Sequence, residues 1–562
     1  VMLPALDTFF VRMGGGTDVI VGSPVSGRTH PALRDVQGLF VNMLALRADL
    51  RGDPPFTEVL ARIKESTRQD IERRDFPFEA LIRRLNPHRE PGRSPIFNVV
   101  LVMREPNFAS ELRAGALVLS QDEVPLTRVS RYDLTLIVAE TAPGLRLTFE
   151  YNAELFDPSS VVRWAGNLER LLEAVAADPE RCISCLPLLA DAERAAVLWE
   201  WNDTEREVAD GRLLHQLFER QAAASPDRLA VVFEGEHLTY RQLDDRANRL
   251  AHYLRRLGVG PEVLVGICLE RSLDLVIGLL GILKAGGAYV PLDPSYPRPR
   301  LEYMLEDSRV PVVLTQRTLV AGLPARKIRR VLLDGDRQAI ARESRLDPPG
   351  GAVPDNAAYA IYTSGSTGSP KGALNTHRAI CNRLLWMQEA YPLTAADRVL
   401  QKTPFSFDVS VWELFWPLLA GARLVVARPG IHRESAELIR LIMEQEITTL
   451  HFVPSMFQAF LAEEGVEECR CLKRIFCSGE ALSRELERRC STRLQAELHN
   501  LYGPTEAAVD VTSWACGGTG EARDIPIGRP IANLETLVLD RHGNPVPIGV
   551  PGELHIGGVG LA

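Results

Sequence analysis

A stretch rich in glycine and hydroxyl residues, YTSGSTGSPKG, spans residues 362–372 and follows an apolar, strand-like run at residues 357–362. Glycines let a backbone approach an anion closely, backbone N–H groups and hydroxyls donate hydrogen bonds to it, and Lys371 adds a positive charge. The order differs from a Walker A loop, because Lys371 lies between Pro370 and Gly372 and is not followed by Ser or Thr. A flexible Gly/Ser linker is the alternative interpretation. The preceding strand and the Pro-Lys-Gly ending favour a phosphate-binding loop.

The chain around this loop alternates between strand-like and helix-like segments from about residue 213 onward. Residues 240–257 predict a helix, because Leu243, Ala247 and Leu250 recur at steps of four and three residues. Alternating strands and helices imply mainly parallel sheets covered by helices, which is an α/β architecture. The predicted strands are residues 263–268, 312–315, 331–334, 424–427 and 474–477.

The region before residue 181 is predicted to be a separate part of the chain. Helices are expected at residues 54–74 and 159–177, and a buried strand is expected at residues 98–102. A mostly polar joint at residues 181–212 contains one short helical pattern. The sequence therefore predicts one domain at residues 1–180, a linker at 181–212 and a second domain at 213–562.

Length, charge and cysteine usage restrict the class of protein. A chain of 562 residues is too long for one core. The net charge is −9 with both signs interspersed, so neither nucleic acid binding nor a charged tail is indicated. No apolar run approaches the roughly 18 residues of a membrane span, and the start lacks a signal-peptide pattern. The nine cysteines, among them Cys182, Cys185, Cys469 and Cys471, lack zinc-site spacing, so we expect buried, reduced thiols in a cytoplasmic protein.

Six segments follow one another in a recognisable order. Besides the phosphate-binding loop, they are LTYRQL at 238–243, LKAGGAYVPLDP at 283–294, FDVS at 407–410, NLYGPTE at 500–506 and GELHIGGVGLA at 552–562. The set resembles the motifs of the adenylate-forming superfamily, and in particular the adenylation domains of nonribosomal peptide synthetases. The resemblance implies the large N-terminal α/β core of these enzymes.

Three segments of the first domain resemble late motifs of a condensation domain, the peptide-bond-forming unit of the same synthetases. They are GLFVNM at 38–43, RDFPFE at 74–79 and GRSP at 92–95. The resemblance implies the C-terminal half of a condensation domain, with a chloramphenicol-acetyltransferase-like α/β fold. The family's His-His-x-x-x-Asp-Gly motif is absent, since none of the 11 histidines is adjacent to another. We therefore expect this part to be inert in condensation, with His30 and His88 as surface or structural residues and the missing half upstream of Val1.

The resemblance implies attack of a substrate carboxylate on the α-phosphorus of ATP, which gives an acyl-adenylate and pyrophosphate. Two anions then meet, so hydrogen-bond donors and positive charge have to surround them. By resemblance, Thr505 contacts the α-phosphate, Glu506 holds Mg²⁺ and Tyr502 stacks on adenine. Catalytic roles are assigned to Thr363, Lys371, Thr505 and Glu506. The remaining nucleotide contacts are assigned to Ser364, Gly365, Ser366, Thr367, Gly368, Gly479, Glu480, Ala481, Asn500, Tyr502 and Gly503.

Asp408 matches the aspartate that this family pairs with a substrate α-ammonium, so an α-amino acid is favoured over a fatty or aryl acid. His451, Ser478 and Asp510 are polar members of an otherwise apolar wall, and a substrate hydroxyl would give them a partner. This combination resembles the serine-type set of the family. The alternative is that His451 and Asp510 satisfy each other and that the substrate is merely small. The full set carried over is Asp408, Val409, Trp412, His451, Phe476, Ser478, Leu501, Val509 and Asp510.

The resemblance also implies cofactors and partners. ATP and Mg²⁺ are expected, and the aminoacyl group is expected to pass to phosphopantetheine on a downstream carrier domain. The expected partners are an amino acid, L-serine by the pocket, together with the carrier and neighbouring synthetase domains, and neither nucleic acid nor membrane. Because the chain stops inside the sixth motif, the small C-terminal subdomain is expected to be missing. A free-standing acyl- or aryl-CoA ligase and an inactive fragment that binds ATP and an amino acid are the alternatives.

Overall fold

The described residues of the computed structural model form two units. Unit 1 consists of Val1–Glu200 and of Leu537–His555, which we call the returning segment, and unit 2 of Trp201–Thr536 and Ile556–Ala562. The structure describes the chain except for residues 34, 88–93, 105–110, 115–116, 121–128, 142–143, 208–210, 325–326, 365–369 and 519–523, and at 111–114, 117–120 and 432 it describes only the backbone. The prediction for His88 therefore lies outside the described residues, whereas His30 is exposed.

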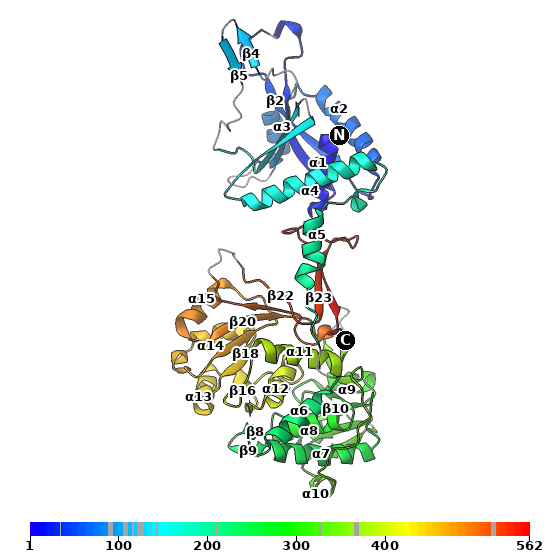
Figure 1. Cartoon of the computed structure of the whole chain (residues 1–562), viewed down its shortest axis with the longest axis vertical. Coiled ribbons are helices and arrows are strands. Elements are labelled where there is room, and N and C mark those ends of the chain that lie inside the picture. The colour runs from blue at the N-terminus through cyan, green and yellow to red at the C-terminus, as the bar shows by residue number, and fades with distance from the viewer. Residues whose placement is uncertain are drawn as a thin grey trace. The chain divides into compact units, whose positions relative to one another are not determined.

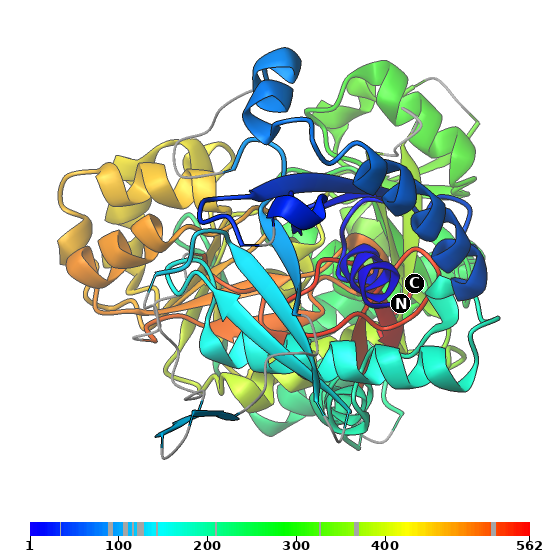
Figure 2. The same cartoon turned by 90° about the horizontal axis from the view of Figure 1, so that it is seen from above.

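A five-stranded sheet with the order β2-β1-β3-β6-β7 forms the centre of unit 1, seen as blue and cyan arrows in Figure 2. Its inner pairs, β1 with β3 and β3 with β6, are parallel, and its outer pairs are antiparallel. The buried strand predicted at residues 98–102 is confirmed as β3. The strands are β1 (Asp18–Ser26), β2 (Val41–Asp49), β3 (Val99–Arg104), β6 (Leu134–Thr141) and β7 (Gly144–Tyr151), while β4 (Glu111–Ala114) and β5 (Leu117–Ser120) pair separately.

Helices α1 and α4 pack against this sheet, because their apolar residues share one core with its strands (Figure 1). Leu6 and Phe9 of α1 and Leu168 of α4 pack in the same cluster as Leu136 and Val138 of β6. The helices predicted in this part of the sequence are confirmed as α2 and α4, and the short helix expected in the joint is α5. The helices of unit 1 are α1 (Met2–Arg12), α2 (Phe56–Glu72), α3 (Phe78–Leu85), α4 (Pro158–Ala177) and α5 (Asp191–Leu198).

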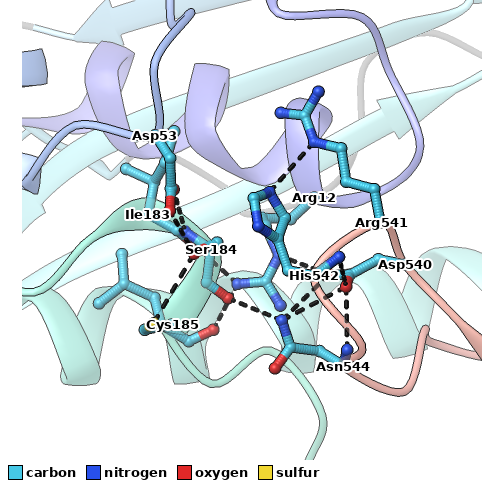
Figure 3. A network of polar contacts seen from close by, with 10 residues as sticks. Arg12, Asp53, Ile183, Ser184, Cys185, Asp540, Arg541, His542 and Asn544 are labelled. Carbon is cyan, nitrogen blue, oxygen red and sulfur yellow. Dashed lines mark hydrogen bonds and ion pairs between the residues drawn. The ribbon is translucent and has the colours of Figure 1, made fainter.

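The returning segment belongs to unit 1 through a network of polar contacts (Figure 3). Its turn is organised by Asp540, whose carboxylate accepts a hydrogen bond from the backbone N–H of Asn544 (2.9 Å) and lies 3.9 Å from the guanidinium of Arg12. The Asn544 side chain donates to the carbonyl of Ser184 (3.1 Å), and the Ser184 hydroxyl donates to Asp53 (2.6 Å). Segments far apart in the sequence are thus joined by side-chain amides, hydroxyls and carboxylates.

The first sheet of unit 2 has six strands in the order β13-β12-β10-β11-β14-β15, and β15 alone runs antiparallel to its neighbour. The strand predicted at residues 331–334 is confirmed as β13, but it lies two residues earlier in the chain and ends at Leu332. There the carboxylate of Asp336 accepts a hydrogen bond from the backbone N–H of Leu332 (2.9 Å) and the chain turns. The strands are β10 (Leu264–Ile267), β11 (Ala288–Pro291), β12 (Val312–Thr315), β13 (Arg329–Leu332), β14 (Ala357–Thr363) and β15 (Lys371–Thr376).

The second sheet has nine strands in the order β22-β21-β20-β19-β18-β16-β17-β8-β9, parallel from β20 to β8 and antiparallel at both edges. The predicted strands at 312–315 and 474–477 are confirmed as β12 and β19 to the residue. The strands are β8 (Leu229–Phe233), β9 (Glu236–Thr239), β16 (Arg398–Gln401), β17 (Arg423–Val426), β18 (Thr449–Phe452), β19 (Arg474–Cys477), β20 (Glu497–Tyr502), β21 (Thr512–Ala515) and β22 (Arg529–Pro530), with β23 (Leu534–Leu539) and β24 (Glu553–Gly558) as a separate pair.

Alternate residues of β19 point to opposite faces of the nine-stranded sheet, and this decides which helices cover which face. Ile475 and Cys477 pack with residues of α13, α14 and α15, whereas Phe476 packs with α12. The helix predicted at residues 240–257 is confirmed as α7. The helices are α6 (Leu214–Ala224), α7 (Tyr240–Arg256), α8 (Leu273–Lys284), α9 (Arg298–Asp307), α10 (Arg337–Ala341), α11 (His377–Ala390), α12 (Val409–Ala420), α13 (Ser435–Gln445), α14 (Pro454–Ala462) and α15 (Arg484–Arg493).

The cysteines are not buried uniformly. Cys469 is buried as predicted, but the prediction is wrong for Cys185, which is exposed. Cys185 ends a short 3-10 turn in which Ile183 and Ser184 are the buried residues, so the third side chain faces outward. None of the described helices is both long and apolar enough to cross a membrane.

Candidate functional site

The two ends of the glycine-rich stretch lie on neighbouring strands. Thr363, the last residue of β14, pairs with Lys371, the first residue of β15, and Ser364 begins the connection between them. Lys371 is exposed, as is required of a residue that binds the phosphates of a nucleotide arriving from solution. Residues 365–369 lie outside the described part of the chain, so the roles of Gly365, Ser366, Thr367 and Gly368 stay predictions.

The turn after β20 lies against β15. The side-chain amide of Asn375 donates to the carbonyl of Thr505 (3.0 Å), which places this turn beside the strand that starts at Lys371. Glu506 in the turn is exposed, and Tyr502 just before it is 38% exposed. Mg²⁺ binds through one or two carboxylates together with substrate phosphates. One exposed carboxylate at this position therefore fits a magnesium ion that is held mainly by a nucleotide.

The backbone after this turn has an unusual conformation. Ala508 has a φ of 54° and Val509 a φ of 82°, a region that β-branched residues almost never adopt. A Cβ atom at Gly503 would lie 2.6 Å from the Cα atom of Asp510, so only glycine permits this close approach. Such backbone strain costs about 1 to 3 kcal/mol per residue and clusters at functional sites. Here it holds Asp510 inside the protein, next to the turn that carries Thr505.

Asp408 caps the start of α12 and accepts hydrogen bonds on both carboxylate oxygens. Oδ1 accepts from the backbone N–H of Val409 (2.8 Å), and Oδ2 accepts from the hydroxyl of Thr505 (2.7 Å). Burial raises the pKa of Asp408 to about 6, the Thr505 hydrogen bond opposes this, and the charge of Asp510 adds to it. A nearby cation would favour the ionised form of such a carboxylate. The site is therefore suited to an ammonium group beside Thr505.

Three neighbouring parallel strands bring predicted wall residues to one face of the nine-stranded sheet. His451 of β18 is in register with Phe476 of β19. The Trp412 ring from α12 lies with its centroid 5.5 Å from Phe476 and 6.1 Å from His451. Ligands bind at the carboxyl ends of strands in open α/β sheets, and these residues lie at or near those ends. The predicted apolar wall residues that share this core are Val409, Trp412, Phe476, Leu501 and Val509.

The polar wall residues have partners within the protein. His451 Nε2 lies 2.9 Å from the hydroxyl of Ser478, and Arg383 donates to the carboxylate of Asp510 at 2.5 Å. Burial, with the charge of Lys402 nearby, holds the pKa of His451 well below its ordinary value, so the ring is neutral. The expectation that these groups lack a partner until a substrate hydroxyl arrives is therefore wrong. The alternative, in which His451 and Asp510 satisfy each other, is also wrong.

Several residues predicted to contact the nucleotide already have hydrogen-bond partners within the protein. Gly479, Glu480 and Ala481 form an exposed loop after β19, and Gly479 has a φ of 86°. The carboxylate of Glu480 accepts hydrogen bonds from the backbone N–H (3.1 Å) and hydroxyl (3.2 Å) of Ser455. Asn500 donates to the carbonyl of Pro526 (2.9 Å). These contacts fix the loops that follow β19 and β20.

Sequence reasoning missed two buried cations. The Arg383 side chain is 1% exposed, and Lys402, which follows β16, is 2% exposed with its ammonium 4.4 Å from the centre of the Phe452 ring. Burial lowers the pKa of Lys402 to about 8. A signal for Arg383 was present in the sequence, since it falls on the helical stripe that contains Ile380 and Met387. A charged residue on such a stripe needs a buried partner.

Comparisons with known proteins agree with this arrangement. The AMP-binding enzyme family matches residues 218–562, and the Condensation domain family matches residues 1–198. Tyrocidine synthase 3 of Brevibacillus parabrevis is 42% identical over 564 residues. Phosphinothricin tripeptide synthetase PhsB of Streptomyces viridochromogenes is 42% identical over 588 residues. Both comparisons cover 100% of this chain, which spans 9% and 48% of the lengths of these relatives.

Solved structures give the same result. The nonribosomal peptide synthetase FmoA3 is 26% identical with a TM-score of 0.86, and the comparison covers 100% of this chain and 60% of that one. Holo-AB3403, a four-domain nonribosomal peptide synthetase bound to AMP and glycine, is 28% identical with a TM-score of 0.87, covering 100% of this chain and 42% of that one. The predicted fold class and the predicted class of adenylating ligase are confirmed. The chain belongs to the AMP-binding enzyme family, as the adenylation unit of a nonribosomal peptide synthetase that carries condensation-domain sequence ahead of it.

Proposed function

We propose that this chain activates an α-amino acid with ATP and delivers it to the phosphopantetheine thiol of a carrier domain. The observation that carries the proposal is the hydrogen bond between Thr505 and Asp408. It joins the residue expected to meet the α-phosphate to the carboxylate expected to pair with the substrate ammonium. A site that binds both groups side by side holds the two reactants of adenylation in contact.

The chemistry follows from this placement. An amino acid whose ammonium pairs with Asp408 has its own carboxylate near the hydroxyl of Thr505. One carboxylate oxygen attacks the α-phosphorus, the bond from that phosphorus to pyrophosphate breaks, and an aminoacyl-adenylate forms. Lys371 and Thr505 supply positive charge and a donor, and Mg²⁺ held by Glu506 would neutralise phosphate charge. The carrier thiolate then attacks the acyl carbon, AMP leaves, and a thioester forms.

We further propose L-serine as the amino acid. Trp412 and Phe476 are large and completely buried in the wall, which favours a small side chain. Ser478 keeps hydrogen-bonding capacity after its contact with His451, because a hydroxyl has one proton and two lone pairs. The FmoA3 synthetase has a structure with α-methyl-L-serine-AMP bound and is 27% identical to this chain with a TM-score of 0.84, covering 100% of this chain and 63% of that one. That relationship supports a serine-like substrate.

Amino-acid-dependent exchange of pyrophosphate into ATP tests the proposed adenylation and the proposed substrate in the full-length protein, with all twenty amino acids and a panel of fatty and aryl acids. We expect L-serine to exceed L-alanine by about tenfold or more, because only serine can add a hydrogen bond to the Ser478 hydroxyl, which keeps bonding capacity beside His451. L-Threonine should lose roughly tenfold to a hundredfold through its extra methyl group. Preference for a large apolar, aromatic or charged amino acid would exclude serine but keep adenylation. Exchange with fatty or aryl acids alone would indicate the acyl- or aryl-CoA ligase.

A further inference from the structure

Arg383 lies behind the predicted amino-acid pocket, on α11. Its side chain and that of Asp510 are each 1% exposed, and the two groups are joined by a hydrogen bond of 2.5 Å. The Nε and Nη1 atoms of Arg383 are buried and have no hydrogen-bond partner among the described residues. The guanidinium also lies 4.9 Å from the centre of the Trp386 ring. Arg383 is thus a fully buried cation with unused donors beside a wall residue of the pocket.

Arg383 and Asp408, the carboxylate proposed to bind the substrate ammonium, both influence the same buried side chain, that of Tyr359. Tyr359 is completely buried, and its hydroxyl has no hydrogen-bond partner among the described residues. Burial raises the pKa of Tyr359 well above its ordinary value, the carboxylates of Asp408 and Asp510 add to this, and Arg383 opposes it. The three charged groups therefore all influence the buried Tyr359 hydroxyl, and Asp510 also raises the pKa of Asp408. The other buried cation of the site, Lys402, has its own counter-charge in Glu413.

The negative and positive charges of Asp408, Asp510 and Arg383 can be counted against each other. Asp408 and Asp510 are two carboxylates, and Arg383 compensates one of them. An amino acid brings one ammonium at its α-carbon, which compensates the other, while its carboxylate faces Thr505 and the nucleotide, where Lys371 and Mg²⁺ would supply positive charge. Since an unpaired buried charge is strongly unfavourable, no cation beyond that ammonium is needed.

We infer that Arg383 is a specificity-determining positioning residue, which neutralises Asp510 and thereby restricts the pocket to amino acids with uncharged side chains. This inference rests on the proposed function, because it assumes that Asp408 binds an α-ammonium. Arg383 lies outside the predicted pocket wall, and its pairing with Asp510 gives a reason why the pocket would reject cationic amino acids of the size of serine. Removing Arg383 should leave Asp510 as an uncompensated carboxylate that recruits a second cation, and a cationic substrate side chain can supply it.

The test compares L-serine with L-2,3-diaminopropionate, which has an amine in place of the serine hydroxyl, by pyrophosphate exchange in the full-length protein. We expect the wild type to favour serine by about a hundredfold or more. Arg383→Met should narrow that ratio by about tenfold or more, since one buried charge loses its partner. Arg383→Lys should keep most of the wild-type ratio, and Arg383→Met combined with Asp510→Asn should restore it. Arg378→Met is the matched control, because Arg378 lies on the same helix in an exposed pair with Asp355.

Asp510→Asn alone provides the opposite change and does not depend on whether Arg383→Met folds. It leaves Arg383 uncompensated, so the ratio of serine to diaminopropionate should rise and exchange with L-aspartate should increase. Folding of every variant is checked by thermal unfolding. An unchanged ratio in folded Arg383→Met, an unchanged aspartate rate in Asp510→Asn, or a wild type that prefers a cationic amino acid would overturn the inference. A wild type that shows no amino-acid-dependent exchange would instead refute the proposed function.

Discussion

Charged side chains are buried in both units, but they are compensated in different ways. In unit 1, both carboxyl oxygens of Asp7 on α1 are buried without a hydrogen-bond partner among the described residues, and burial raises the pKa of Asp7 to about 8. In unit 2, Lys284 is completely buried and contacts three carboxylates, those of Glu219 (2.6 Å), Asp244 (2.9 Å) and Asp347 (2.9 Å). Unit 1 therefore accommodates its buried acid by protonation, whereas unit 2 uses a buried charge to join elements.

The largest expected effect comes from breaking the Lys284 cluster. Lys284 ends α8, Glu219 lies on α6 and Asp244 on α7, so one ammonium connects three helices. Lys284→Met should lower the free energy of unfolding of unit 2 by about 3 kcal/mol, because it removes hydrogen bonds from one buried ammonium to three partly exposed carboxylates. Urea unfolding, combined with hydrogen exchange of α6 to α8, measures this loss.

A matched control separates burial from charge in that experiment. Arg241 on α7 pairs with Asp227 at 3.2 Å, but its side chain is 59% exposed. Arg241→Met should change the free energy of unfolding by less than about 1 kcal/mol, since water already screens the pair. If both variants had the same effect, the difference between buried and exposed charge in unit 2 would not hold.

The second prediction concerns Lys371 in unit 2, whose charge is exposed to water and so needs no buried counter-charge. Lys371 is exposed, so Lys371→Ala should leave the stability of unit 2 nearly unchanged. The same change should lower pyrophosphate exchange by about tenfold to a thousandfold, as expected for the loss of one contact to the charged transition state. Glu506→Gln should act in the same range through Mg²⁺. Lys327→Ala, at another exposed lysine, is the control, and wild-type exchange in Lys371→Ala would remove this residue from the mechanism.

Buried apolar residues and buried polar residues differ in how well their structure could be predicted from the sequence. Strand β19 could be predicted to the residue, because Ile475, Phe476 and Cys477 are consecutive apolar residues that are all buried in a covered sheet. The partners of polar groups could not be predicted, since they depend on how distant segments meet. Arg383 and Asp510 are 127 positions apart, and Asn544 and Ser184 are 360 apart. The neighbouring sequence does not identify the two members of such a pair. A charged residue on an apolar helical stripe shows that a buried partner is needed, but it does not show which residue that partner is.

The third prediction uses the titration of Asp7. The folded-state pKa of about 8 lies above the ordinary value of 3.8, so between these values only the unfolded chain releases the proton and stability falls as the pH rises. Unit 1 should lose roughly 3 kcal/mol of unfolding free energy between pH 5 and pH 7, because the unfolded chain releases this proton and the folded one keeps it. Asp7→Leu should remove this dependence, and Asp75→Leu, at an exposed site, should not. Hydrogen exchange of α1 at both pH values measures it, and identical pH profiles for wild type and Asp7→Leu would contradict the prediction.

The smallest effect on stability is expected in the returning segment. Polar contacts that are only partly buried join this segment to the rest of unit 1. Asn544 donates to the carbonyl of Ser184 and lies in a turn organised by Asp540, while Arg541 in the same turn contacts only its neighbour His542 among the described side chains. Asn544→Ala removes one hydrogen bond between two segments of unit 1, which corresponds to about 1 kcal/mol. Hydrogen exchange in residues 537–555 should then become roughly fivefold faster, while α1 and the strands of unit 1 keep their protection. Arg541→Ala should have no such effect. Equal exchange in the Asn544 variant and the wild type would mean that the apolar contacts of the segment, not its polar ones, hold it in unit 1.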